Sequence, residues 1–121
     1  ALAAALARNE TLEELDLGKS GLGEAAGVAL ACALEQNKAL KKMRLCDNLG
    51  LGDAGVEALA AALARNETLE ELDLGKSGLG EAAGVALACA LEQNKALKKM
   101  RLCDNLGLGD AGVEALAAAL A

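Results

Sequence analysis

Two hydrophobic patterns alternate along this chain. In the first, leucine or methionine alternates with charged residues, as at Leu15 and Leu17, with the period of two that is typical of a half-buried β-strand. In the second, apolar residues recur at helical spacing: Val28, Leu30, Ala31 and Leu34, and then Val56, Leu59, Ala60 and Leu63. Each unit is therefore predicted to be a strand, a turn and a helix, with a right-handed crossover to the next parallel strand.

Two kinds of polar residue are expected to satisfy backbone groups within these units. Asp53 lies where an N-cap would begin the second helix. Asn48 and Asn105 lie in the turns that follow strands. Their side-chain amides are predicted to be buried and to satisfy backbone groups that have no partner in the sheet.

The pattern repeats without a single substitution. Residues 1–64 are identical to residues 58–121, a period of 57, and each period contains two shorter phrases. Natural tandem repeats drift because each copy mutates separately, so this identity indicates an idealised, artificial sequence. We expect one repeat domain over 1–121 without evident caps, made of about four units that begin near Leu12, Leu40, Leu69 and Leu97.

Each phrase resembles the leucine-rich-repeat pattern L-x-x-L-x-L-x-x-N/C-x-L. The first phrase matches at Leu12, Leu15, Leu17, Ser20 and Leu22, with Ser in the Asn/Cys position. The second matches at Leu40, Met43, Leu45 and Asn48, and one extra residue delays its last leucine to Leu51. The alternation of 28- and 29-residue units is similar to the ribonuclease-inhibitor-like subclass, including related repeats of innate-immune receptors.

This resemblance implies an α/β fold, a leucine-rich-repeat solenoid in the form of a horseshoe arc. The parallel β-sheet would lie on the concave side and the α-helices on the convex side. Curvature is also expected from the unequal widths of strands, about 4.8 Å apart, and of packed helices, about 8–10 Å apart. The family further implies protein binding on the concave side.

The outward side of the predicted strands carries alternating charges, and we call this surface the strand face: Glu14, Asp16, Lys42, Arg44, Glu71, Asp73, Lys99 and Arg101. Aligning Leu12 with Leu40 places each acidic residue beside a basic residue of the next strand. We expect these charges to neutralise one another and to fix the register of the strands. The alternative is a striped binding surface for a protein partner.

The composition excludes several classes of function. The chain has no His and no aromatic residue, so it lacks an imidazole base or metal ligand and a stacking platform for nucleic-acid bases. Its net charge of −6 disfavours nucleic acid and anionic membranes. The longest uncharged helical stretch, residues 25–34, is too short to cross a bilayer. We expect no enzyme, no cofactor, no metal site, and neither a nucleic-acid nor a membrane partner.

Three motifs look chemical but are better explained by structure. Residues 50–55 match the dinucleotide fingerprint G-x-G-x-x-G, yet Asp53 would repel a pyrophosphate there. The segment Gly18-Lys19-Ser20 resembles the end of a P-loop, but Glu13 stands where an earlier glycine is required. The sequons that begin at Asn9 and Asn66 are expected to be loops between a helix and a strand.

The four cysteines are two copies of one pair: Cys32, Cys46, Cys89 and Cys103. They lack the close C-x-x-C spacing of zinc or redox sites. Equivalent cysteines two units apart would be about 10 Å from one another, too far for a disulfide. We expect free thiols, which fit a reducing compartment such as a bacterial cytoplasm, and an exposed position for Cys46.

Two functions remain open from the sequence. Ala1 and Ala121 both fall inside the same repeated helix, so we expect apolar end faces and end-to-end self-association into a ring or a filament. The strict identity of the strand-face residues favours a structural scaffold without a ligand. The alternative is a protein-binding module that uses the strand face.

Overall fold

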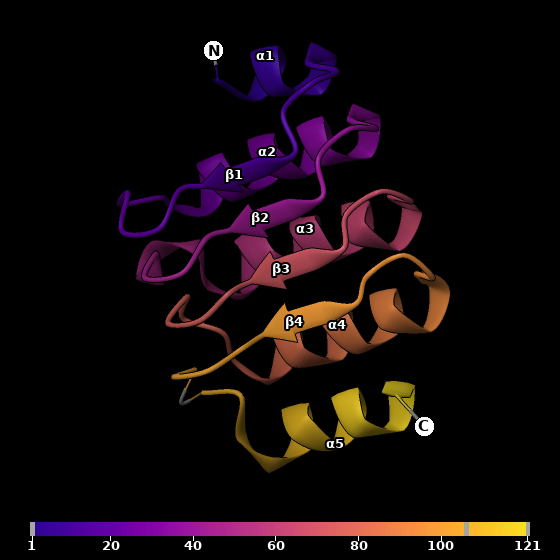
Figure 1. Cartoon of the computed structure of the whole chain (residues 1–121). Helices are drawn as coiled ribbons and strands as arrows, with labels where there is room; N and C mark the ends of the chain where they lie inside the picture. Colours follow the sequence, from indigo (N-terminus) through magenta and orange to yellow (C-terminus); the bar gives the residue numbers. More distant parts are fainter. Residues whose placement is uncertain (1, 106, 121) are drawn as a thin grey trace.

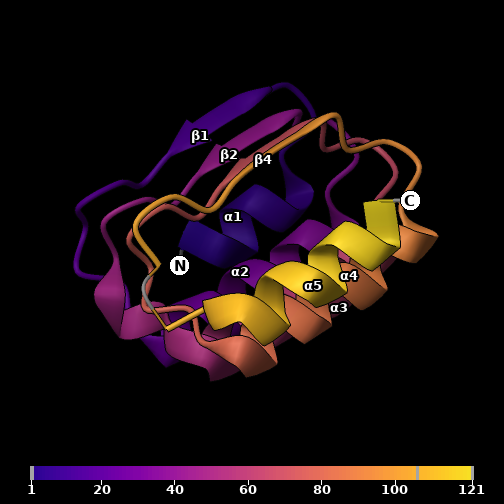
Figure 2. The same cartoon turned by 90° about the horizontal axis from the view of Figure 1, so that it is seen from below.

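The computed structural model describes residues 2–105 and 107–120 as two layers, one of strands and one of helices (Figures 1 and 2). Ala1 and Ala121, on which the expected end faces depend, lie outside these residues. The helices stack side by side behind the sheet. The elements in chain order are α1 (Leu2–Arg8), β1 (Glu14–Asp16), α2 (Glu24–Gln36), β2 (Lys42–Arg44), the short 3-10 helix η1 (Leu49–Leu51), α3 (Gly52–Arg65), β3 (Glu71–Asp73), α4 (Glu81–Gln93), β4 (Lys99–Arg101) and α5 (Gly109–Leu120).

The four strands form one parallel sheet in the order β1-β2-β3-β4. Its register pairs Glu14 with Lys42, Lys42 with Glu71, and Glu71 with Lys99. This register confirms the alignment of the two kinds of unit. Since consecutive strands are neighbours and a helix lies between each pair in sequence, the α/β solenoid predicted from the sequence is confirmed.

The core is a thin aliphatic layer between the sheet and the helices. Met43, Leu45 and Leu74 from the sheet side and Leu59 and Leu63 from α3 are almost wholly buried. Leu51 is buried whereas Leu49 is 69% exposed, so the extra residue of the longer unit does delay the last core leucine as expected. No helix among the described residues is both long and apolar enough to cross a membrane.

One expected core position is wrong. Val28 is 43% exposed, whereas Val56 in the other kind of helix is fully buried. Gly27 faces α3, and a Cβ atom built on it would lie 3.0 Å from the Cα atom of Gly55. The close approach of the two helices at this glycine fixes the rotation of α2, and Val28, one residue further around the helix, consequently faces solvent.

Asp53 caps a different helix from the one expected. The η1 turn precedes α3, which begins at Gly52, so Asp53 falls inside the first turn. Its Oδ1 atom accepts hydrogen bonds from the backbone N–H groups of Gly80 (2.7 Å) and Ala83 (3.2 Å). These groups belong to the first turn of α4, which has no capping side chain of its own. The cap is therefore a contact between neighbouring repeats.

Both turn asparagines make the predicted hydrogen bonds, but the predicted burial is confirmed only for Asn48. The Asn48 side chain is buried; its Nδ2 atom donates to the carbonyls of Leu17 and Leu45, and its Oδ1 atom accepts from the N–H groups of Ser20 and Leu22. Asn105 makes the equivalent bonds, although it is only partly buried. Each asparagine thus joins the turn of its own unit to the turn of the unit before it.

A second row of asparagines, not predicted from the sequence, joins the units at the opposite edge. Asn66 is 5% exposed, donates to the carbonyls of Leu34 and Asn37, and accepts from the N–H groups of Thr68 and Leu69. Asn37 and Asn94 make the equivalent bonds. A recurring asparagine three residues before the first leucine of each unit was the available signal.

Candidate functional site: the strand face

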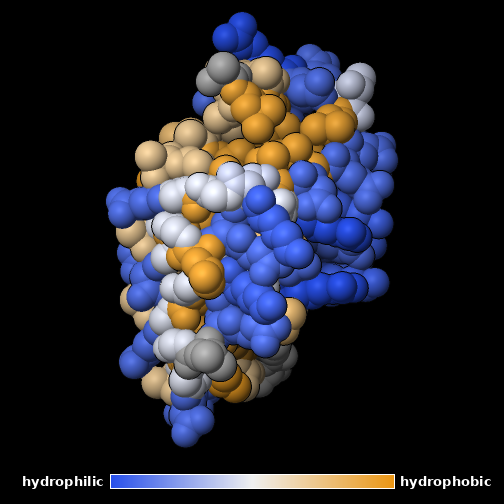
Figure 3. All heavy atoms as spheres, turned by 90° about the vertical axis from the view of Figure 1, so that its left-hand side faces the viewer, coloured by the Kyte–Doolittle hydropathy of each residue, from blue (hydrophilic) through white to orange (hydrophobic). Residues whose placement is uncertain are grey.

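The strand face consists of two parallel rows of side chains that run across the sheet. Because side chains alternate along a strand, Leu15, Met43 and Leu72 point into the core while their neighbours point outward. Figure 3 views the molecule from the side of the turns, so the strand face lies along its right-hand margin, where hydrophilic residues gather. The first row is Glu14, Lys42, Glu71 and Lys99, and the second row is Asp16, Arg44, Asp73 and Arg101.

The first row is a continuous chain of ion pairs. Lys42 Nζ lies 3.8 Å from Glu14 Oε1 and 3.6 Å from Glu71 Oε2, and Lys99 Nζ lies 3.4 Å from Glu71 Oε1. Desolvation acts to raise the pKa of Glu71, but the charges and hydrogen bonds of Lys42 and Lys99 outweigh it and lower the pKa below its usual range. The expected neutralisation therefore holds in this row.

Among the described residues, the charges of the second row are not joined by ion pairs as those of the first row are. Asp16 and Asp73 turn toward their own turns, where they accept hydrogen bonds from the N–H groups of Gly18 (2.9 Å) and Gly75 (3.0 Å). Within the described part of the chain, neither Arg44 nor Arg101 lies within 4.0 Å of a carboxylate oxygen. Both arginines are exposed. The second row thus presents two guanidinium groups to solvent.

A shallow hollow lies between the two rows at the centre of the sheet. Its volume is only about 20 Å³, so it can seat a side chain's end rather than a small molecule. Its lining joins both rows and one core residue: Lys42, Arg44, Glu71, Leu72, Asp73, Lys99 and Arg101.

Cys46 lies beside the second row and is less exposed than expected. It is partly buried, and its Sγ atom packs at the position where Gly18 has no side chain, since a Cβ atom there would lie 3.1 Å away. Burial, followed by the charges of Asp73, Asp47 and Asp16, raises the pKa of the Cys46 thiol. Cys32, Cys89 and Cys103 are exposed, and all four cysteines are free thiols.

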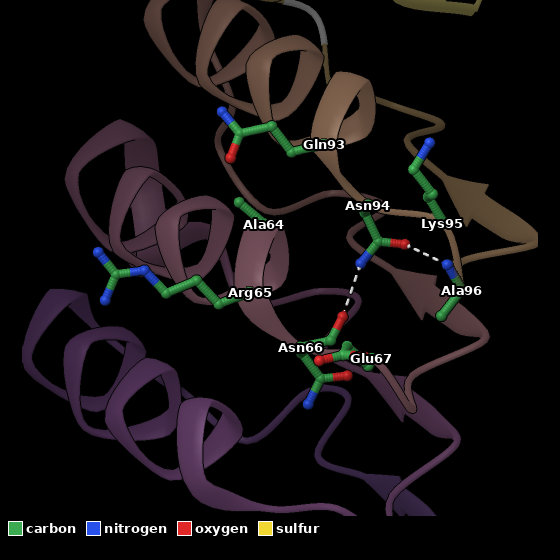
Figure 4. A pocket seen from close by; sticks show the side chains of 8 residues that line it. All are labelled: Ala64, Arg65, Asn66, Glu67, Gln93, Asn94, Lys95 and Ala96. Carbon is green, nitrogen blue, oxygen red and sulfur yellow. Dashed lines mark hydrogen bonds between the residues drawn. The ribbon is translucent and has the colours of Figure 1, made fainter.

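Two larger grooves recur at the loops between helices and strands, 57 residues apart. One, of about 440 Å³, is lined by residues that include Arg65, Gln93 and Lys95 (Figure 4), and its equivalent near Arg8 measures about 540 Å³. The side chains of Arg65 and Lys95 point in different directions. The amides of Asn66 and Asn94 are already bonded to backbone groups. These grooves therefore offer no set of polar groups that converge on a ligand.

The motifs set aside in the sequence have structural roles. In the fingerprint segment, Leu51 is buried, and a Cβ atom on Gly50 would lie 2.9 Å from the carbonyl oxygen of Leu22. The glycine therefore permits contact between repeats. Asn66, the first residue of one sequon, is buried and fully bonded. Within residues 2–105 and 107–120, no group of three or more potential ligand side chains is placed to hold a metal ion.

The excess negative charge lies in the helical layer. The strand face has four acidic and four basic residues, whereas α2 to α5 carry eight acidic residues and, as their one basic residue, Arg65: Glu24, Glu35, Asp53, Glu57, Glu81, Glu92, Asp110 and Glu114. An acidic partner is therefore repelled by the helices but not by the strand face.

Comparison with known families agrees with this fold. Residues 8–31 and 65–88 match the family model described as "Leucine Rich repeat". These segments run from the end of a helix through the next strand into the following helix. The chain thus has the leucine-rich-repeat fold, and the two matched segments, which together cover less than half of the chain, are similar to repeats of the leucine-rich-repeat family. No curated protein matches the chain significantly by sequence.

Solved structures similar to this chain include two repeat domains. "Leiomodin-1 Actin-Binding Site 2 (ABS2)" is 25% identical, with a TM-score of 0.81 over 88% of this chain and 62% of that chain. The tropomodulin C-terminal domain of Caenorhabditis elegans is 13% identical, with a TM-score of 0.58 over 98% of this chain and 88% of that chain. The present chain spans less than two thirds of the leiomodin structure.

Proposed function

We propose that this chain is a protein-binding module and that the strand face is its binding surface. The observation that carries the proposal is the pair of exposed arginines, Arg44 and Arg101, in a surface whose other row is already paired. Arginine is enriched among residues that dominate protein interfaces, because it forms directed hydrogen bonds to carboxylates. The similarity to a domain whose name includes an actin-binding site supports a protein as the class of partner.

The distribution of charge supports the strand face over the helical layer. A partner that approaches the helices meets eight acidic residues and few cations. A partner that approaches the strand face meets a balanced surface with two free donors. Specificity there would come from the positions of charges rather than from net attraction.

The test is a selection of binders followed by charge reversal. A random peptide library and purified actin, the protein named by one structural neighbour, are each assayed against the chain. We expect binders whose affinity falls at least about tenfold in Arg44→Glu/Arg101→Glu, the loss expected for two charge pairs. Arg65→Glu is the matched control, because this arginine is 78% exposed on the helical side. Binders that respond equally to both variants, or to neither, would refute the strand face as the binding surface.

A second candidate function is a structural scaffold whose copies associate end to end. The carboxylate of Asp53 caps the first turn of α4, and the identical Asp110 in α5 could cap α2 of another copy at Gly23 and Ala26. Apolar side chains gather at the α1 end of the stack (Figure 3), where Leu2 is 53% and Leu12 is 39% exposed. Both features support a repeat-like contact between copies.

Helix α1 opposes this association. Residues 1–7 repeat residues 58–64, so α1 corresponds to the second half of α3 and to the same part of α5. In a continued stack, α5 of one copy would occupy the place that α1 holds against α2. Deleting residues 1–8 should therefore increase the mass measured by light scattering, and Asp110→Asn should reverse the increase. An unchanged mass on deletion would eliminate this candidate.

We further propose that the sequence is idealised rather than natural. Identity between residues 1–64 and 58–121 supports this origin, and alternating 28- and 29-residue units support a template of the ribonuclease-inhibitor-like subclass. A natural gene that encodes the same unvaried 57-residue repeat would contradict it.

A further inference from the structure

We infer that the partner of the strand face is an α-helix that lies across the strands, with two carboxylates seven residues apart that pair with Arg44 and Arg101. This inference rests on the proposed protein-binding function and specifies the partner's conformation and charge pattern. It depends on where the free donors lie in the sheet.

The spacing of the two arginines matches a helix. Arg44 is on β2 and Arg101 on β4, in the same row, with Asp73 of β3 between them. Neighbouring strands are about 4.8 Å apart, so the two positions are separated by about 9.6 Å. Residues i and i+7 of an α-helix lie on one face and are about 10.5 Å apart along the axis.

An extended partner laid across the strands does not match. Side chains on one face of a β-strand recur every two residues, at about 6.7 Å and then about 13.4 Å. Neither distance is close to two strand spacings. A partner strand added to the edge of the sheet would not reach both arginines, since Arg44 is on an internal strand. Of the α-helix and the β-strand, the α-helix is therefore the element that places two carboxylates at the spacing of the two arginines.

The residue between the carboxylates has a preferred charge as well. Position i+3 or i+4 of the bound helix would lie over Asp73, whose Oδ1 atom accepts the Gly75 N–H group but whose negative charge remains. Lys or Arg is favoured there and Glu is disfavoured. The contact face of the partner helix thus carries an acidic, a basic and an acidic residue, each three or four residues after the one before.

The ion pairs of the first row do not have to break when the partner helix binds Arg44 and Arg101. Lys42 and Lys99 are held by Glu14 and Glu71, so they do not compete with Arg44 and Arg101 for the incoming carboxylates. The hollow lined by Leu72 between the rows, of about 20 Å³, leaves room only for the end of a side chain on the underside of the helix. The second row can therefore bind the partner's carboxylates while the ion pairs of the first row stay in place.

The experiment uses a synthetic alanine-rich helical peptide with Glu at positions i and i+7, Lys at i+4, and one terminal Trp. The full chain contains no aromatic residue, so the fluorescence anisotropy of the peptide's Trp reports binding without background. Titrations are done at low salt, where exposed charge pairs are least screened. We expect saturable binding that weakens about tenfold in Arg44→Gln/Arg101→Gln and is unchanged in Arg65→Gln.

A spacing control separates this inference from the proposed function. A peptide of the same composition with Glu at i and i+5 places its carboxylates on different sides of the helix, and it should bind about tenfold more weakly. If both peptides bind equally and both depend on Arg44 and Arg101, the helical partner is refuted while the strand face remains a binding surface. If neither peptide binds, or if the substitutions of Arg44 and Arg101 leave binding unchanged, the inference is overturned. The proposed function is then tested separately by the library selection. Circular dichroism of each variant checks that the fold is kept.

Discussion

The carboxylate of Asp53 lies 2.7 Å from the backbone nitrogen of Gly80, in the next repeat of the stack. The same oxygen accepts the N–H group of Ala83, so one side chain satisfies two amides at the start of α4. Gly80 makes the approach possible, because a Cβ atom there would lie 2.9 Å from the other carboxylate oxygen. The cap therefore couples the stability of one helix to the position of its neighbour.

Replacing Asp53 by alanine should destabilise the protein by about 0.5–2 kcal/mol, the usual cost of losing a helix cap. The free energy of unfolding can be measured by urea titration followed by far-UV circular dichroism. Asp110→Ala is the matched control, since Asp110 has the same sequence context but is exposed, and no hydrogen bond to its carboxylate is found in the described part of the chain. Equal losses in the two variants would contradict the role of the cap.

Replacing a buried asparagine should lower the free energy of unfolding more than replacing Asp53 does. Asn48→Ala and Asn66→Ala each leave backbone groups of two repeats without partners, and each should cost about 1–3 kcal/mol. Asn9 stands in the same sequence context as Asn66 but is exposed, and among the described residues its side chain accepts hydrogen bonds only from Thr11 and Leu12. Asn9→Ala should therefore cost clearly less than Asn66→Ala in thermal melts. A buried asparagine whose loss has no effect beyond error would disprove the assignment.

Val56 and Val113 are equivalent in the repeat but differ in burial, so they test how burial affects stability. Val56→Ala removes two buried carbon atoms and should cost about 2 kcal/mol once the cavity is included. The equivalent Val113 is 54% exposed, and Val113→Ala should change stability by less than about 0.5 kcal/mol. Chemical denaturation of both variants provides the comparison. Similar values would mean that burial in the structure does not govern stability here.

The two rows of the strand face should respond differently to charge reversal and to salt. Lys42→Glu turns two attractions, to Glu14 and Glu71, into repulsions and should lower stability by about 1 kcal/mol at low salt, and by less at high salt. Arg44→Glu should cost less than Lys42→Glu, because Arg44 has no ion pair to lose within the described residues and the change only adds repulsion from Asp16 and Asp73. Thermal melts in low and high NaCl measure both. A larger loss in Arg44→Glu would contradict the geometry of the second row.

The partly buried thiol should react more slowly than its exposed copy. The raised pKa of Cys46 leaves less thiolate near pH 8 than an ordinary cysteine has, and thiolate is the reactive form. Alkylation of Cys46 should therefore lag behind that of Cys103 and catch up as the pH rises above about 9, the ordinary value for this thiol. Tryptic peptides 45–65 and 102–121 differ in sequence and separate the two sites by mass spectrometry. Equal rates at pH 8 would refute the environment described for Cys46.

The sequence predicted the fold because its repeat leaves few choices. Alternation at Leu15 and Leu17, helical spacing at Leu59 and Leu63, and the recurrence of both patterns predict stacked strand–helix units without any contact information. The turn role of Asn48 also followed, since a buried loop must satisfy its backbone groups. The second asparagine row was missed because its residues fall in loops whose burial depends on the neighbouring repeat.

Only part of the geometry of the strand face could be predicted from the sequence. Pairing along the first row was expected from the alignment and is present at Lys42. The freedom of Arg44 was not expected, because nothing in the alternation shows that Asp16 and Asp73 turn toward the N–H groups of Gly18 and Gly75. A short carboxylate bonds the nearest backbone donor, and that choice depends on the conformation of the turn.

The unit, its register and the alternation of charge follow from the amino-acid sequence alone, because they depend on local periodicity and on identity between repeats. Which copy of each residue is buried depends instead on how the repeats pack in the folded chain. Leu69 is fully buried whereas the equivalent Leu12 is 39% exposed, and Val56 is buried whereas Val113 is not. Identical sequences cannot encode this difference. It arises because a residue in a solenoid is covered by the repeats on either side, so burial is a property of position in the stack.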